Sequence, residues 1–156
     1  MAKKSPIQIK VKLLDERAKM PLITKGNACF DFYAIEDTQI APVDAGVGTL
    51  VRTGLAFEIP EGYHMKLFMR SSYGLKTPYI LGNCVGIIDS SYRGEVQGIF
   101  KVFTKTMGFC DNAYTIFKGD RFMQGLIEKN IDVEIKKVKE LSETERGEGG
   151  FGSTGE

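Results

Sequence analysis

The chain has 156 residues, of which 42% are apolar and 26% are charged, so it suits a single globular domain with its own core. Its 21 basic and 20 acidic side chains leave a formal net charge of +1, which argues against a nucleic-acid duplex or an anionic membrane as a partner. Three widely spaced cysteines, Cys29, Cys84 and Cys110, argue against a disulfide framework. We therefore expect no nucleic-acid and no membrane partner, and a cytoplasmic or other reducing intracellular compartment.

Short segments with the pattern of β-strands follow one another along the chain. Ile7, Ile9, Val11 and Leu13 recur every second residue, the period that places side chains on one face of a half-buried strand. Further apolar runs, divided by Gly, Pro and Asn, predict strands within 29–35, 48–60, 63–69, 79–88, 95–103, 113–130 and 131–138. Only SSYGLKT is expected to form a short helical turn. The pattern predicts an all-β, single-domain sandwich or distorted barrel of short strands.

Two polar segments lie among these expected strands. MRSSYGLKT places Arg70 beside Ser71 and Ser72, a group of hydrogen-bond donors at the expected end of a strand, although serine pairs of this type usually cap helices or form turns. GNCVGIIDSSYRGEV places Asp89 three residues before Tyr92, between two apolar arms, and predicts a hairpin. On chemistry alone, Asp89 could be an ordinary turn residue.

The C-terminal segment RGEGGFGSTGE is rich in glycine and contains almost nothing that could hold a fold by itself. A glycine-rich end of this kind is commonly a disordered terminus. Arg146, however, offers a fork of donors for phosphate, and Phe151 offers a ring face. We therefore divide the chain into a β domain at 1–145 and an arm at 146–156, which we expect to be mobile without ligand and to close over a nucleotide.

These segments, together with GNACFDFYA and KGDRFMQGLI, resemble the five sequence motifs of the trimeric dUTPases, in the family's order from about Gly26 to the C-terminus. The resemblance implies the β-clip fold and a homotrimer with active sites built between subunits. It also implies Mg²⁺-assisted hydrolysis of dUTP to dUMP and pyrophosphate, by attack of water at the α-phosphorus.

The same resemblance implies a role for each matching residue. Asp89 would activate the attacking water, and Tyr92 would pack on the deoxyribose and refuse a 2′-hydroxyl. Asp31 would face the metal through water, because Mg²⁺ keeps several of its waters. Contacts to the phosphates fall on Arg70, Ser71, Ser72, Gln124 and Arg146. Contacts to the base and its pocket fall on Asn83, Gly86, Ile87, Ile88, Gln97 and Phe151. Additional arm contacts fall on Gly152, Ser153 and Thr154.

The sequence departs from the family's pattern at a few places. Met69 stands where Gly or Pro is common, Tyr73-Gly74 replaces a Leu-Ala-like pair, and Cys29 occupies a common glycine position. Residues 101–114 form a link several residues longer than is usual between the third and fourth motifs. This insertion could be a longer loop or a contact for a subunit or a protein partner.

The sequence leaves two alternatives to a dUTPase open. A dCTP deaminase resembles dUTPases in fold and in its RSS segment, but it would need a glutamate base in the hairpin region, where GIFKVF offers none. A regulatory protein could keep the dUTPase scaffold and bind another protein through its surface insertion. The lone His64 has no evident partner in the sequence and is expected to be a surface or packing residue.

Overall fold

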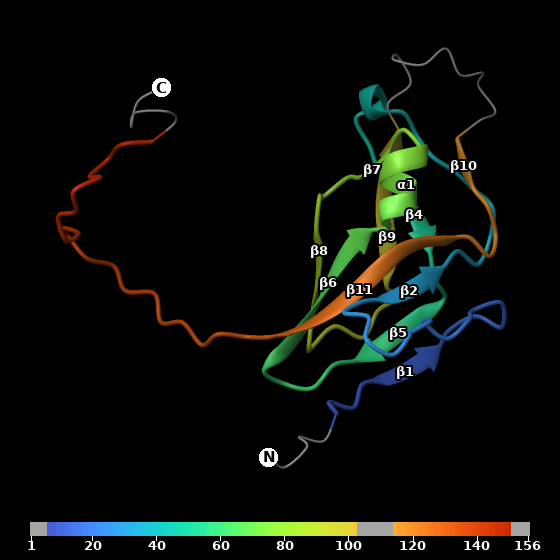
Figure 1. Ribbon diagram of the computed structural model, residues 1–156, viewed down its shortest axis with the longest axis horizontal. Coiled ribbons are helices and arrows are strands. Elements are labelled where there is room, and N and C mark those ends of the chain that lie inside the picture. Colours follow the sequence, from blue (N-terminus) through green and yellow to red (C-terminus); the bar gives the residue numbers. More distant parts are fainter. Residues whose placement is uncertain (1–5, 103–113, 151–156) are drawn as a thin grey trace.

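The computed structural model describes residues 6–102 and 114–150, and the fold consists of two main antiparallel sheets with smaller strand pairs around them (Figure 1). The four-stranded sheet has the order β2 (Phe30–Tyr33), β11 (Arg121–Lys129), β6 (Tyr63–Met69) and β8 (Gly86–Asp89). The three-stranded sheet has the order β4 (Thr49–Arg52), β9 (Gln97–Val102) and β7 (Tyr79–Leu81).

The remaining elements are short. Strand β1 (Lys10–Leu13) pairs with β5 (Leu55–Glu58), and β3 (Thr38–Gln39) pairs with β10 (Thr115–Ile116). A 3-10 turn, η1, spans Val43–Ala45, and the one-and-a-half-turn helix α1 spans Ser71–Lys76. Within the described ranges, no helix has the length and apolar character that a membrane crossing requires. The all-β prediction and the helical turn after Arg70 are confirmed.

The core lies between the inner faces of the two main sheets. Phe100 of β9 and Phe122 of β11 are fully buried and meet edge to face, with ring centroids 5.5 Å apart. Met65 and Leu67 alternate with more exposed residues along β6 and face the same core. Alternation along a strand places one set of side chains inward. Burial of each of these apolar side chains between the two sheets stabilises the folded state by roughly 1.5–3 kcal/mol.

The expected strand at 131–138 is wrong for the single chain. This segment has no strand assignment, and Figure 1 shows the chain after β11 running away from the sheets. Ile131, Val133 and Ile135 are 85%, 78% and 94% exposed. Apolar residues do alternate in this segment, but a strand also needs a neighbouring strand to complete its backbone hydrogen bonds.

The expected hairpin around Asp89 is also corrected by the structure. Strand β8 pairs with β6, whereas β9 pairs with β4 and β7. No ladder joins β8 to β9 in this fully described part of the chain. The two arms therefore belong to different sheets and separate from each other, and the opening between them forms a pocket.

Candidate active site

A pocket of about 270 Å³ opens between β8 and β9. Seven residues that the sequence analysis selected lie in its wall, namely Asn83, Gly86, Ile87, Ile88, Asp89, Tyr92 and Gln97. The other lining residues are Leu67, Leu81, Gly98, Ile99 and Met123, which the sequence analysis did not select. These residues lie within expected strands, but the alternation of apolar and polar residues does not distinguish the floor of a pocket from a packed core.

The backbone geometry explains why this pocket can recognise a flat polar ring. Among the described strands, β8 pairs with β6 alone and so has one free edge. Strand β9 pairs with β4 over 97–100 but with β7 only over 100–102, so its start at Gln97 and Gly98 also has a free edge, and both free edges belong to residues that line the pocket. A strand edge presents N–H and C=O groups in fixed positions. Close packing leaves little room for larger side chains at two glycines of this wall. A Cβ atom at Gly86 would lie 3.1 Å from Leu67, and one at Gly98 would lie 2.7 Å from the Phe100 ring.

Asp89 lies at the end of β8 with its side chain exposed. Among the described residues, no hydrogen bond or ion pair engages its carboxylate, so both oxygens are available to a water or a ligand. Its cross-strand partner is His64. The His64 ring is itself engaged, with Nδ1 2.7 Å from Oδ1 of Asn130 and Nε2 3.7 Å from the Glu128 carboxylate. These contacts fit the packing role expected for His64.

A tight turn carries Tyr92 into the pocket wall. The Tyr92 amide donates to the carbonyl of Asp89 at 3.1 Å, and Arg93 donates to the carbonyls of Ser90 and Tyr92 at 2.6 and 2.9 Å. The Tyr92 hydroxyl donates to the carbonyl of Glu95 at 3.1 Å. Tyr92 is thus held by its amide at one end of the turn and by its hydroxyl at the other, although 45% of the residue is exposed.

The second group of selected residues gathers at the other end of β6. Nε of Arg70 lies 3.1 Å from Oδ1 of Asp31, and Arg121 pairs with Oδ2 of the same carboxylate at 3.2 Å. Gln124 is the cross-strand partner of Asp31, and its amide lies 3.4 Å from the Met69 carbonyl. The structure therefore brings Asp31, Arg70 and Gln124 together, at the start of the helix that contains Ser71 and Ser72.

Asp89 and Arg70 lie far apart within one chain. Asp89 is opposite His64, while Arg70 follows Met69 at the other end of the same strand. Six residues of strand at about 3.3 Å each separate these positions, which gives roughly 20 Å. The separation applies to Asp89 and Arg70 themselves, because the pocket wall also includes Leu67 and Met123, and Met123 is the cross-strand partner of Met69.

The C-terminal arm is described only as far as Gly150. Arg146 donates from Nε to the carbonyl of Gly149 at 2.8 Å, within a turn that contains Gly147 at φ +51°. The predicted contacts at Phe151, Gly152, Ser153 and Thr154 lie outside the described residues. Most of the 101–114 insertion does so too, and its predicted role as a protein contact is untested.

Comparison with known proteins decides the family. A family model described as dUTPase matches residues 16–155, which is most of the chain. The chain belongs to the dUTPase family. Curated dUTPase relatives, each called deoxyuridine 5′-triphosphate nucleotidohydrolase, include one from Nautilia profundicola, 41% identical over 96% of this chain and 99% of the relative. Another, from Finegoldia magna, is 36% identical over 94% of this chain and 99% of the relative.

Solved dUTPase structures agree with the fold. The dUTPase of Staphylococcus bacteriophage 80alpha, solved with dUPNHPP, has a TM-score of 0.78 and 31% identity, covering 95% of this chain and 98% of its own. The dUTPase from phage phi11 of S. aureus, described with a structural Mg(II) ion, has a TM-score of 0.72 and 27% identity, covering 85% and 97%. The predicted β-clip fold is confirmed by these likenesses.

Proposed function

We propose that the chain is a dUTP diphosphatase, which hydrolyses dUTP to dUMP and pyrophosphate by attack of water at the α-phosphorus. One observation carries the proposal: a pocket between two strand edges has the unengaged carboxylate of Asp89 at one end and the ring of Tyr92 in its wall. Membership of the dUTPase family supports the same activity.

Selection of uracil follows from the strand edges. Fixed backbone donors and acceptors from β8 and β9 can pair with the N–H and C=O groups of a uracil edge. Cytosine presents an amino donor where uracil presents a carbonyl, so a backbone N–H would meet another donor. Gln97 and Asn83 border the same opening and would support the base from either side.

Asp89 would act as the general base. An ionised carboxylate needs only to orient a water and accept its proton as the oxygen approaches phosphorus. Tyr92 would pack against the deoxyribose and leave no room for a 2′-hydroxyl. Asp89 is the acidic member among the described residues that line the pocket, and no glutamate accompanies it there. The lining therefore does not favour the dCTP deaminase alternative.

The Mg²⁺ that the family implies fits this chain as a partner of the triphosphate. Among the described residues, no group of three His, Cys, Asp or Glu side chains could cage a metal. Both oxygens of Asp31 already face guanidinium groups. Mg²⁺ commonly keeps waters and takes phosphate oxygens, so we assign it to the phosphate chain, with Asp31 reached through water. Bound there, the ion would neutralise phosphate charge.

We also propose that the active unit is a homotrimer. The α-phosphorus must lie within a few ångströms of a water held by Asp89, whereas Arg70 of the same chain lies roughly 20 Å away along the ladder. Phosphate donors must then come from another copy. The exposed apolar side chains of Ile131, Val133 and Ile135 also fit a segment that another copy of the chain covers in an assembly.

The activity is tested by measuring pyrophosphate release from dUTP, dCTP, dTTP and UTP in the presence of Mg²⁺. We expect kcat/KM for dUTP to exceed the other three values. Ammonia release from dCTP would indicate a deaminase, and absence of any turnover of dUTP would refute the proposal.

The assembly is tested separately, by light scattering and by mixing variants. We expect the mass of three chains. A chain carrying Asp89→Asn, mixed with a chain that ends at Glu145, should show more activity than either alone, because one composite site in the mixed trimer can be intact. An active monomer, or mixed trimers without any recovery of activity, would contradict the shared site.

A further inference from the structure

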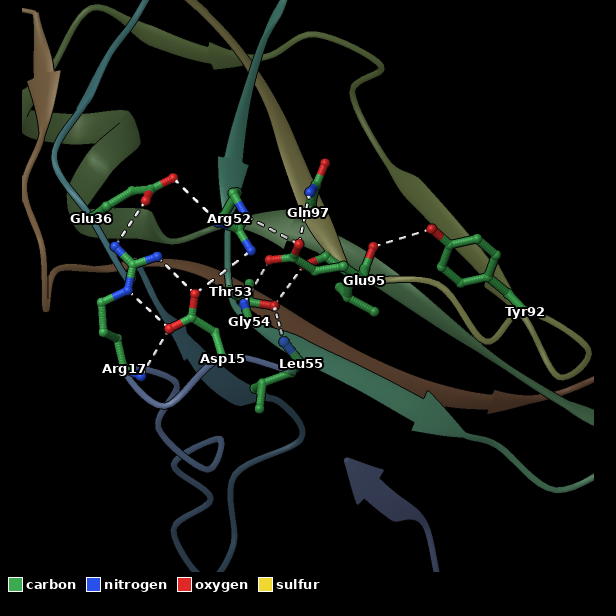
Figure 2. Close-up of polar contacts among 11 residues, drawn as sticks. Asp15, Arg17, Glu36, Arg52, Thr53, Gly54, Leu55, Tyr92, Glu95 and Gln97 are labelled. Atoms are coloured by element: carbon green, nitrogen blue, oxygen red, sulfur yellow. Dashed lines mark hydrogen bonds and ion pairs between the residues drawn. The ribbon is translucent and has the colours of Figure 1, made fainter. Parts of the chain in front are cut away.

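A network of charged side chains, none of them assigned to the site, connects through Glu95 to two site residues, Gln97 and Tyr92 (Figure 2). Arg52 of β4 is at its centre, with Nε 3.1 Å from Oε2 of Glu95. On its other side, Arg52 lies 3.8 Å from Asp15 and 3.7 Å from Glu36. Arg17 completes the network by pairing with Asp15 at 2.7 Å and with Glu36 at 3.0 Å.

Glu95 is the member of this network that reaches the pocket wall. Its Oε1 accepts the amide of Gly54 at 2.7 Å, and its Oε2 accepts Nε2 of Gln97 at 3.1 Å in addition to Arg52. Its backbone carbonyl accepts the hydroxyl of Tyr92. The Glu95 side chain is 15% exposed, and it does not line the pocket itself. It therefore contacts two lining residues from behind.

The segment that carries Glu95 is held firmly by β4 and β5. The buried hydroxyl of Thr53 donates to the carbonyl of Val96 at 2.6 Å, and the Val96 amide donates to the carbonyl of Leu55 at 2.8 Å. Thr53 is fully buried, so these bonds are shielded from water. Glu95 thus has a fixed base from which its carboxylate and carbonyl can orient other groups.

The orientation of the Tyr92 ring depends on the backbone carbonyl of Glu95. A Cβ atom at Gly94 would overlap the hydroxyl and ring atoms of Tyr92, so the ring folds back over a position that has no side chain. The hydroxyl then meets the carbonyl of Glu95. Without that acceptor, an exposed tyrosine has several staggered rotamers available.

We propose that Glu95 is a positioning residue for sugar and base selection: held by Arg52 and Gly54, it fixes the Gln97 amide through its carboxylate and the Tyr92 ring through its carbonyl. This inference rests on the proposed function, since it concerns how the same pocket selects the base and the sugar of the nucleotide. Through Arg52, the Asp15–Arg17–Glu36 group is connected to Glu95 and so to the pocket, although none of these three residues lines the pocket.

The sharpest variant is Glu95→Gln, which keeps the size of the side chain and an oxygen for the Gly54 amide. Its new amide group would turn a donor toward Arg52 and Gln97, which are donors themselves. We expect the ratio of kcat/KM for dUTP over dCTP to fall by roughly three- to tenfold, the scale of one or two lost hydrogen bonds, because the Gln97 amide beside the base loses its acceptor. The loss should appear chiefly in KM for dUTP.

The matched control is Glu36→Gln, which weakens the same network on the side away from the pocket. It should lower stability without changing the dUTP/dCTP ratio. Tyr92→Phe tests the backbone carbonyl of Glu95 separately: removing the hydroxyl should lower the ratio of kcat/KM for dUTP over UTP, whereas Glu95→Gln keeps that carbonyl and should leave the dUTP/UTP ratio nearly unchanged.

The outcomes are distinguishable. If the unmodified chain does not hydrolyse dUTP, the proposed function is refuted. If Glu95→Gln hydrolyses dUTP with an unchanged dUTP/dCTP ratio, if Tyr92→Phe keeps the dUTP/UTP ratio, or if Glu36→Gln lowers the dUTP/dCTP ratio as much as Glu95→Gln does, the positioning role alone is refuted.

Discussion

The hydroxyl of Tyr73 donates a 2.8 Å hydrogen bond to Oδ2 of Asp120, across 47 residues of sequence. This bond ties helix α1 to the turn that precedes β11, and Oδ2 also accepts the amide of Phe117 at 3.1 Å. Burial, together with the bond to Asp120, raises the pKa of Tyr73 above its usual range, so the hydroxyl stays protonated and remains a donor. Tyr73 also stacks on Tyr79, with centroids 5.8 Å apart.

Tyr73→Phe should therefore lower the free energy of unfolding by about 1 kcal/mol, the usual net value of such a bond. Because α1 begins with Ser71 and Ser72, KM for dUTP should rise at the same time. Urea denaturation and steady-state kinetics provide the two measurements. Tyr33→Phe is the control, because no described hydrogen bond engages the Tyr33 hydroxyl. Equal behaviour of the two variants would show that the bond to Asp120 is unimportant.

Asp89→Asn should retain nucleotide binding while reducing kcat by roughly a hundredfold or more, the scale expected when a general base is lost. Asparagine preserves the shape of the side chain but does not accept a proton from water. Calorimetry with a non-hydrolysable dUTP analogue measures binding, and pyrophosphate release measures turnover. The exposed Glu61, changed to Gln, is the control for altered charge. Full turnover in Asp89→Asn would remove Asp89 from the mechanism.

Ending the chain at Glu145 should leave the thermal midpoint of the unliganded protein nearly unchanged, because the described residues of this arm are largely exposed and add nothing to the core. The same truncation should sharply lower kcat/KM if the removed residues close over the nucleotide. Arg146→Ala in the full chain should give a smaller loss. A truncated chain with full activity would contradict the role of the arm.

Asp15 should contribute to the pH dependence of stability. Hydrogen bonds from Arg17 hold the pKa of the Asp15 carboxyl well below its usual value of 3.8. Since the folded-state pKa is the lower one, the unfolded chain binds the proton first as pH falls. The stabilisation is therefore present above about pH 4 and is lost as pH decreases toward the folded-state pKa.

Asp15→Asn should accordingly be less stable than the unmodified chain near neutral pH and should lose less stability on acidification below pH 4. Urea denaturation at a fixed protein concentration, repeated from neutral pH downward, measures this. Glu61→Gln should follow the unmodified chain. An unchanged slope for Asp15→Asn in the acid range would show that Arg17 and Asp15 are not paired in solution.

The sequence by itself determined most of the strand segments, and its resemblance to the dUTPase motifs selected seven of the twelve residues of the pocket wall. Period-two alternation fixes which side chains of β6 face inward, and a short polar run between apolar arms locates Asp89 and Tyr92 without knowledge of pairing. These features are local, so neighbouring residues suffice to specify them.

Only the tertiary structure decided which strands pair and which side chains meet across long distances in sequence. It separated β8 from β9, left 131–138 unpaired in the single chain, and brought Arg52 of β4 against Glu95. It also placed Asp89 and Arg70 at opposite ends of β6. Strand pairing depends on partners that lie tens of residues away, and local periodicity carries no record of which partner will complete each backbone edge.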